Sequence, residues 1–238
     1  MSEGQEKYDP RIFYDGEYYP GTDRGNEKSI GVSRSAVRAN RFYRNLMVPE
    51  SGSKLLDIGC GEGTYLSLIK DTGCECYGID ISENVISVAR ERVGEDVNLI
   101  CGDADPLPFQ DKMFDYVTAW GVVEHFPSIG AILREMWRVS ADTATIVIMV
   151  PNMYYYKFVW DTLRKGSGPV RHQKIEKLYA FREWKDRIES SGFSIKKVHR
   201  HNKFSKSGIS MLLRKVLIPF HFSNHFVFVC EKDIQVEF

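Results

Sequence analysis

Residues 55–66 read LLDIGCGEGTYL, and this stretch decides the fold that the sequence predicts. An apolar run reaches Asp57, glycines follow at Gly59, Gly61 and Gly63, and a helical pattern begins directly after them. Glycine lets the backbone turn sharply and lets a ligand approach closely, beside the positive end of a helix. The stretch therefore predicts a strand, a ligand-binding loop and a helix in succession.

Further apolar runs alternate with helical patterns along the rest of the chain. The runs that we expect to form strands are KLLDI, CECYGIDI, VNLI, FDYVTAW, TATIVIMV, SIKKVHRH and HFVFVCEK. The helices are expected over residues 64–72, 82–93, 128–139 and 174–191. Such alternation predicts an α/β fold with a seven-stranded, mostly parallel sheet and helices on both of its faces.

The length of 238 residues suits one large domain with additions. Residues 1–50 are expected to form an N-terminal arm and a helix over 29–47, which together cap the site or close over it as a lid. Residues 51–238 would form the ligand-binding domain, in which 152–224 contribute elements on the substrate side. An insert is expected between the last two strands.

Two kinds of nucleotide site fit the glycine loop alone. A nicotinamide dinucleotide site needs G-x-G-x-x-G and an acidic residue about 20 positions later. Thr64 stands at the third glycine position, whereas Asp80 supplies the acidic residue at the end of the second strand. A carboxylate there accepts hydrogen bonds from ribose hydroxyls in either kind of site, so Asp80 does not separate them.

Four linked motifs do separate them. LLDIGCGEGTYL, YGIDIS, CGDADPLPF and FDYVTAWGVVEHF occur in an order and spacing that resemble the class I methyltransferases dependent on S-adenosylmethionine (SAM). The resemblance is strongest to the branch with the quinone-biosynthesis and small-molecule methyltransferases, and it spans residues 54–151. It implies a Rossmann-like sheet whose last strand is antiparallel, SAM as the cofactor and S-adenosyl-L-homocysteine as the product.

The resemblance also implies which residues contact the cofactor. The glycine loop would lie against the methionine and ribose, Asp80 would hold the ribose hydroxyls, and Asp103 would accept from the adenine amino group. The residues implied to contact SAM are Asp57, Gly59, Cys60, Gly61, Gly63, Asp80, Ile81, Asp103, Ala104, Ala119 and Trp120.

His125 follows the fourth strand and is the candidate general base, because histidine titrates near neutral pH. The alternative is that Glu124 and His125 only hold the pocket wall together. Trp120 is a candidate wall of the acceptor pocket, and simple core packing is the alternative. His172 in PVRHQK is a further candidate for the substrate side, although a solvated loop is the favoured explanation.

The aromatic N-terminal arm supplies three more candidates. Tyr14 and Tyr18 are expected on the substrate side, and Tyr19 is expected against the cofactor if the arm closes as a lid. The alternative is an aromatic patch that only anchors the N-terminus.

The net charge of zero hides a basic section over residues 151–215, with 16 Lys and Arg against 5 Asp and Glu. The leading prediction is methylation of a small-molecule acceptor on oxygen, nitrogen or carbon, and the basic section favours an anionic acceptor. The alternatives are an RNA or protein methyltransferase that docks through this section, and a SAM-binding protein without turnover. Nucleic acid is the less favoured partner.

Other features narrow the class of protein. The segment ISMLLRKVLIPFHF at 209–222 fits contact with a membrane surface, but a helix packed on the sheet is favoured. The N-terminus lacks an apolar stretch behind a basic start, which predicts a cytoplasmic protein. Five cysteines without a CxxC pair predict buried, reduced thiols and no metal site.

Overall fold

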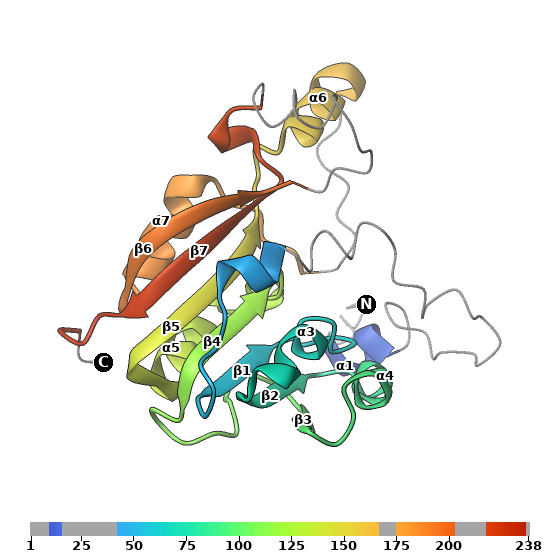
Figure 1. The fold of residues 1–238 in the computed structure, drawn as a ribbon. Helices are drawn as coiled ribbons and strands as arrows, with labels where there is room; N and C mark the ends of the chain where they lie inside the picture. The colour runs from blue at the N-terminus through green and yellow to red at the C-terminus, as the bar shows by residue number, and fades with distance from the viewer. Residues whose placement is uncertain (1–9, 16–41, 167–174, 203–217, 237–238) are drawn as a thin grey trace, which may run out of the picture.

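The computed structural model describes residues 10–15, 42–166, 175–202 and 218–236 (Figure 1). Its centre is a sheet of seven strands in the order β3-β2-β1-β4-β5-β7-β6. The strands are β1 (Lys54–Ile58), β2 (Glu75–Asp80), β3 (Val97–Cys101), β4 (Phe114–Trp120), β5 (Ser140–Pro151), β6 (Phe193–His201) and β7 (His225–Lys232).

The sheet has the predicted direction of its strands. β1 pairs in parallel with β2 and β4, and the parallel pairing continues from β2 to β3 and from β4 to β5. β7 runs antiparallel to both β5 and β6. The expected α/β fold with an antiparallel last strand is therefore confirmed. The insert expected between the last two strands falls between His201 and His225, where residues 203–217 lie outside the described residues.

Helices cover both faces of the sheet, as predicted (Figure 1). Buried side chains of α3 and α4 join one core cluster, and those of α5 and α7 join the other. The helices are α1 (Pro10–Phe13), α3 (Leu66–Ile69), α4 (Glu83–Val93), α5 (Ile129–Val139), α6 (Tyr156–Lys165) and α7 (Phe181–Glu189), with 3-10 turns η2 (Lys70–Thr72), η3 (Val123–His125) and η4 (Phe220–Phe222).

Local sequence explains where the two longest helices begin. Ser82 lies before α4 and its hydroxyl accepts from the Val85 amide, while Ser128 lies before α5 and accepts from the Ala131 amide. A serine at this position binds one of the amides that a helix leaves without an internal partner. α4 ends at Gly94, which has a positive φ of 77°.

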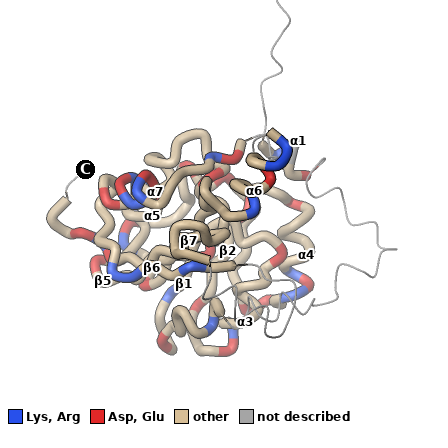
Figure 2. Tube along the Cα trace, turned by 90° about the horizontal axis from the view of Figure 1, so that it is seen from above, with Lys and Arg blue, Asp and Glu red and all other residues tan. Residues whose placement is uncertain are grey.

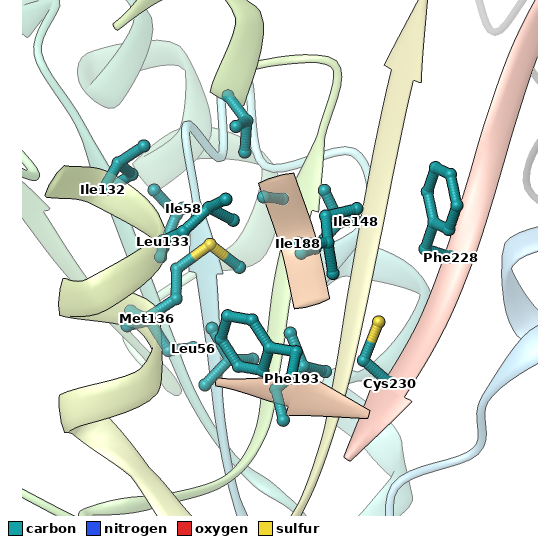
Figure 3. Packing of buried hydrophobic residues seen from close by; sticks show 14 of the residues in the cluster. Leu56, Ile58, Ile132, Leu133, Met136, Ile148, Ile188, Phe193, Phe228 and Cys230 are labelled. Atoms are coloured by element: carbon teal, nitrogen blue, oxygen red, sulfur yellow. The ribbon is translucent and has the colours of Figure 1, made fainter. Parts of the chain in front are cut away.

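The core beneath α5 and α7 consists of interlocking apolar side chains (Figure 3). Leu56 and Ile58 come from β1, Leu133 and Met136 from α5, and Phe228 from β7. These side chains are fully buried, and burial of each contributes roughly 1.5–3 kcal/mol. This packing holds the carboxyl ends of the central strands in fixed positions.

Two local predictions need correction, and part of a third falls outside the residues that the structure describes. The helix expected over 174–191 begins only at Phe181, because the preceding residues bind other parts of the chain through their backbone. Cys101 is exposed, unlike the other four free cysteines, because it ends strand β3 at the sheet edge. Of the helix expected over 29–47, residues 42–46 are helical and 29–41 lie outside the described residues.

Candidate functional site

A cavity of about 500 Å³ lies at the carboxyl ends of β1, β2, β3 and β4. The strand order reverses between β1 and β4, and ligands of open α/β sheets bind in the crevice at such a point. The volume lies within the range of small-molecule and cofactor sites. The cavity is lined by Pro10, Tyr14, Gly59, Ile79, Asp80, Ile81, Gly102, Asp103, Ala104, Asp105, Trp120, Gly121, Val122, His125, Phe126 and Pro127.

The glycine loop brings bare backbone to this cavity. Gly59 has a φ of +63°, and a Cβ added there would lie 2.4 Å from Cγ2 of Val122. Gly63 also has a positive φ, and its missing side chain lets the loop approach Ala89 and Val93 of α4. Any side chain at Gly59 would therefore strain the backbone and clash with the segment that follows β4.

Asp80 ends β2 and is held in place by two backbone amides. Its Oδ2 accepts from the Gly61 amide at 3.0 Å, and its Oδ1 accepts from the Ser82 amide at 3.1 Å. Burial raises the pKa of Asp80 above its ordinary value, although these hydrogen bonds oppose the change. The carboxylate is thus oriented by the loop itself, with its remaining lone pairs available to a ligand.

The far end of the cavity combines one oriented carboxylate with apolar side chains. Asp103 accepts from the Asp105 amide at 3.2 Å through Oδ1. Ile79, Ile81 and Ala104 line the same region. A carboxylate that accepts hydrogen bonds beside an apolar surface suits a flat heterocycle that carries an amino group.

Asp57 lies beneath the loop rather than on the cavity wall. It is 1% exposed, and the Thr118 hydroxyl donates to its Oδ1 at 2.7 Å. Burial raises the pKa of Asp57 to about 7, the Thr118 bond opposes this rise, and the nearby Asp80 adds to it. The ionised form of such a buried carboxylate would be stabilised by a cationic group bound close by.

Three aromatic rings meet on the α3 side of the cavity. Trp120 lies 4.4 Å from Tyr43 and 5.1 Å from Tyr65 between ring centroids. The Trp120 Nε1 and the Tyr65 hydroxyl are buried, and neither has a hydrogen-bond partner among the residues that the structure describes. Unpaired buried polar atoms are costly, and they cluster where a protein binds other molecules.

His125 lies on the opposite wall in η3, with its ring orientation fixed. Its Nδ1 is 2.6 Å from the Ile175 carbonyl oxygen. Because a carbonyl only accepts, Nδ1 carries the proton, and in the neutral ring Nε2 is left with a lone pair. Burial lowers the pKa of His125, so the ring is neutral at pH 7.

Glu124 accompanies this histidine in the interior. Its Oε1 lies 3.8 Å from Nε2 of His125, and its Oε2 is buried without a hydrogen-bond partner in the described part of the chain. Burial raises the pKa of Glu124 to about 8, so its side chain is mostly a neutral acid at pH 7. Two side chains that are mostly neutral at pH 7 thus lie side by side, and His125 is the one that lines the cavity.

The chain is similar in sequence to known proteins. A family model described as "Methyltransferase domain" matches residues 56–148. A demethylmenaquinone methyltransferase of Listeria welshimeri is 31% identical over 194 residues, which are 77% of this chain and 80% of that protein. The chain belongs to the class I SAM-dependent methyltransferases, in the quinone-biosynthesis branch. A demethylmenaquinone methyltransferase of Staphylococcus aureus is 38% identical over 65% of this chain and 67% of its own length.

A solved structure supports the fold. The SAM-dependent methyltransferase from Mesorhizobium loti superposes with a TM-score of 0.62 at 15% identity, over 81% of this chain and 96% of its own. The family match and the Listeria relative, by contrast, show that the chain is a SAM-dependent methyltransferase, as predicted. A nicotinamide site is excluded as the explanation of the glycine loop.

The cavity fits SAM on several independent counts. Gly59 presents backbone without a side chain, Asp80 is held at the cavity by two backbone amides, and Asp103 lies in the same cavity as Ile79 and Ile81. The buried carboxyl of Asp57 matches the cationic amino group of a methionine chain. The donors and acceptors present are those that a nucleoside joined to an amino acid requires.

The structure brings most of the predicted residues together. The predicted residues that line the cavity are Tyr14, Gly59, Asp80, Ile81, Asp103, Ala104, Trp120 and His125, together with Gly121, whose backbone the resemblance places beside that of Ala119 and Trp120. Those that lie behind its wall, in the loop or the ends of the strands, are Asp57, Cys60, Gly61, Gly63 and Ala119. The candidates Tyr18, Tyr19 and His172 lie outside the described residues.

Other lining residues were not predicted. They are Pro10, Ile79, Gly102, Asp105, Val122, Phe126 and Pro127. Most are direct neighbours of a predicted residue at the end of a strand, so extending each motif by one or two positions would have found them. Pro10 belongs to the arm, and no local signal placed it at the cavity.

Proposed function

We propose that the enzyme methylates a small quinone-like aromatic acceptor and that His125 withdraws a proton from it. Its relatives in Listeria and Staphylococcus are named for demethylmenaquinone. The observation that carries the proposal is that one cavity joins the oriented carboxylates of Asp80 and Asp103 to His125 and the Trp120 ring. An aromatic wall and a neutral imidazole suit a flat ring that bears an acidic hydroxyl.

The cofactor contacts follow from the positions of the carboxylates. Asp80 binds the ribose hydroxyls, and Asp103 and Ile81 bind the adenine. Asp57 compensates the charge of the methionine amino group from beneath the glycine loop. Bound SAM supplies a methyl group on a positively charged sulfur, which makes the methyl carbon electrophilic.

The residues of the chain then act on the acceptor. His125 accepts a proton at Nε2, because Nδ1–H is held by the Ile175 carbonyl. Loss of that proton makes the acceptor ring more nucleophilic. Trp120, Phe126 and Pro127 give the cavity an apolar wall that orients the ring and excludes water.

The N-terminal arm contributes to the lid in this proposal. Pro10 and Tyr14 line the cavity. Asp15 accepts at 2.5 Å from the Ser82 hydroxyl, and its carbonyl accepts at 3.1 Å from the Asn84 side chain, both at the start of α4. Residues 10–15 are therefore fastened beside the proposed ribose site, where a lid would close.

The test compares two substitutions at opposite ends of the cavity. His125→Ala is expected to bind SAM within about threefold of wild type but to lose at least about 100-fold in kcat, the usual scale for a general base. Asp80→Ala is expected to weaken SAM binding at least about tenfold, because two or more charge-assisted hydrogen bonds are lost. Calorimetry measures binding, and transfer of labelled methyl into a demethylated quinone measures turnover.

The pH profile gives a second measurement. The pKa of His125 is lowered, so kcat/KM is expected to fall only below its ordinary value of about 6.5, as the imidazole becomes protonated. Unchanged kcat in His125→Ala would remove the role of base. Methyl transfer into RNA or protein fractions, with none into quinones, would overturn the proposed acceptor.

A further inference from the structure

Helix α6 exposes large apolar side chains. It follows β5 and lies beyond the end of that strand, apart from α5 and α7 (Figure 1). None of its residues is buried. Trp160 is 64% exposed and Leu163 is 78% exposed. Single apolar residues at a surface are ordinary, but two such side chains on one short helix indicate a contact surface.

The apolar and basic residues of α6 are arranged in adjacent rows. Tyr156, Trp160 and Leu163 are spaced by four and three positions and share one face of the helix. Lys157 and Arg164 are seven positions apart and form a basic row beside this face, with Asp161 between them. Asp161 pairs with Lys165 at 3.6 Å, so the helix keeps a net positive charge. Figure 2 shows a basic segment of α6 in blue in the view from above.

The same edge of the sheet carries more exposed apolar surface. Met153 and Tyr154, which connect β5 to α6, are 39% and 51% exposed. Phe222 of η4 is 38% exposed, and η4 lies beside this connection because the Asn152 amide donates to the carbonyls of His221 and Ser223. Exposed apolar side chains therefore lie directly before α6 in the chain, and also on η4 beside it.

We propose that α6 binds the surface of an anionic lipid membrane. Trp160 and Leu163 enter the boundary between the headgroups and the acyl chains, and Lys157 and Arg164 contact lipid phosphates. A short amphipathic helix with an aromatic residue on its apolar face and basic residues beside it is suited to this position. Each basic residue adds attraction to an anionic leaflet.

A second copy of the chain fits the surface less well. A stable interface buries about 800 Å² on each partner, with a central apolar cluster. A ten-residue helix with two prominent apolar side chains offers less than this. A symmetric dimer through this surface would also bring the basic residues of both copies into one interface. A lipid surface needs neither a matching shape nor a large area.

The inference goes beyond the proposed function, since it holds for any acceptor. α6 follows the carboxyl end of β5, the same edge of the sheet on which the cavity opens. Binding through α6 would hold that edge toward the bilayer. An apolar acceptor dissolved in the membrane would then have a short path to the cavity.

Vesicle flotation tests the inference without cofactor or acceptor, so its outcome is independent of methyl transfer. The full chain is mixed with vesicles of phosphatidylglycerol and phosphatidylcholine, and separately with vesicles of phosphatidylcholine alone. We expect flotation with the anionic vesicles, and at least about tenfold less after Trp160→Ala and Leu163→Ala are combined, because the buried apolar area is lost. Raising the salt concentration is expected to weaken binding.

Matched variants separate α6 from general surface effects. Val48→Ala combined with Ile234→Ala removes two aliphatic side chains that are 68% and 67% exposed elsewhere, and should float like wild type. Lys157→Glu combined with Arg164→Glu should abolish the preference for anionic lipid. Wild type that stays in the soluble fraction, or α6 variants that float unchanged, would overturn the inference. So would a change from dimer to monomer in the Trp160→Ala, Leu163→Ala variant, measured by light scattering.

Discussion

Two tryptophans on opposite faces of the sheet, one in the core beneath α5 and α7 and the other beneath α3 and α4, differ in their hydrogen bonding. On the first face, Trp184 is fully buried and its Nε1 donates to the Pro151 carbonyl at 2.9 Å. On the second, the Trp120 Nε1 and the Tyr65 hydroxyl have no partner among the described residues. The paired Trp184 side chain stabilises the fold, whereas the polar atoms of Trp120 and Tyr65 remain available beside the cavity.

This contrast predicts that equal chemical changes have opposite effects on the two faces. Removal of the paired side chain lowers the free energy of unfolding. Removal of an unpaired polar group from the other face raises that free energy and affects ligand binding instead. Natural enzymes often show such a trade-off between stability and activity.

The largest expected effect is at Trp184. Trp184→Ala should lower the free energy of unfolding by roughly 3–5 kcal/mol, because it leaves a cavity and removes the bond to Pro151. Urea denaturation of the cofactor-free enzyme measures this. Trp160→Ala is the matched control, and its change should stay within about 0.5 kcal/mol, because that side chain is exposed. Equal losses in both variants would contradict the contrast.

An intermediate effect is expected at Asp57. Its raised pKa means that the folded state binds more protons than the unfolded state between the ordinary carboxyl pKa of about 4 and about 7. Stability from this group therefore falls as pH rises through that window. Asp57→Asn should remove the loss and raise the free energy of unfolding at pH 8 by on the order of 2 kcal/mol.

The same variant should bind SAM less tightly, because the buried negative charge is gone. Urea denaturation at pH 5 and pH 8 and calorimetry with SAM measure the two effects. The difference between wild type and variant isolates Asp57 from Asp80 and Glu124, whose pKa values are also raised. A gain in stability that is equal at pH 5 and pH 8 would contradict this assignment.

The smallest effect is expected at Tyr65. Tyr65→Phe keeps the ring that packs on Trp120 and removes a buried hydroxyl without a described partner, so stability should rise by about 1 kcal/mol. Tyr77→Phe is the control, because the Tyr77 hydroxyl donates to Glu75 and is exposed. Thermal unfolding measures both. A loss of stability in Tyr65→Phe would show that the hydroxyl is paired.

The sequence predicted well those features that depend on residues close together in the chain. The loop from Asp57 to Gly63, the strand ends at Asp80 and Trp120 and the position of His125 all followed from short motifs. Each motif lies at the carboxyl end of a parallel strand, so the sheet topology brings the motifs together without further information. The cavity was therefore predictable in outline.

Features that depend on distant contacts were not predicted. Residues 175–179 have a helical pattern, yet the Lys177 amide donates to the Glu124 carbonyl and Tyr179 forms a bridge with Asn152. These bonds across the chain outweigh local helix propensity, which is weak. The exposure of α6 also escaped prediction, because an apolar helical pattern looks the same whether its face meets a core or the solvent.

The contact of Gly59 with Val122 restricts which substitutions either position tolerates during evolution. The space that a Cβ at position 59 would need is filled by a residue about 60 positions later, so neither position varies freely. Substitution of Gly59 by alanine would require a smaller residue at 122 and a relaxed backbone in the same lineage. The two positions should thus be inherited together, and an engineer who wants a different loop must redesign both at once.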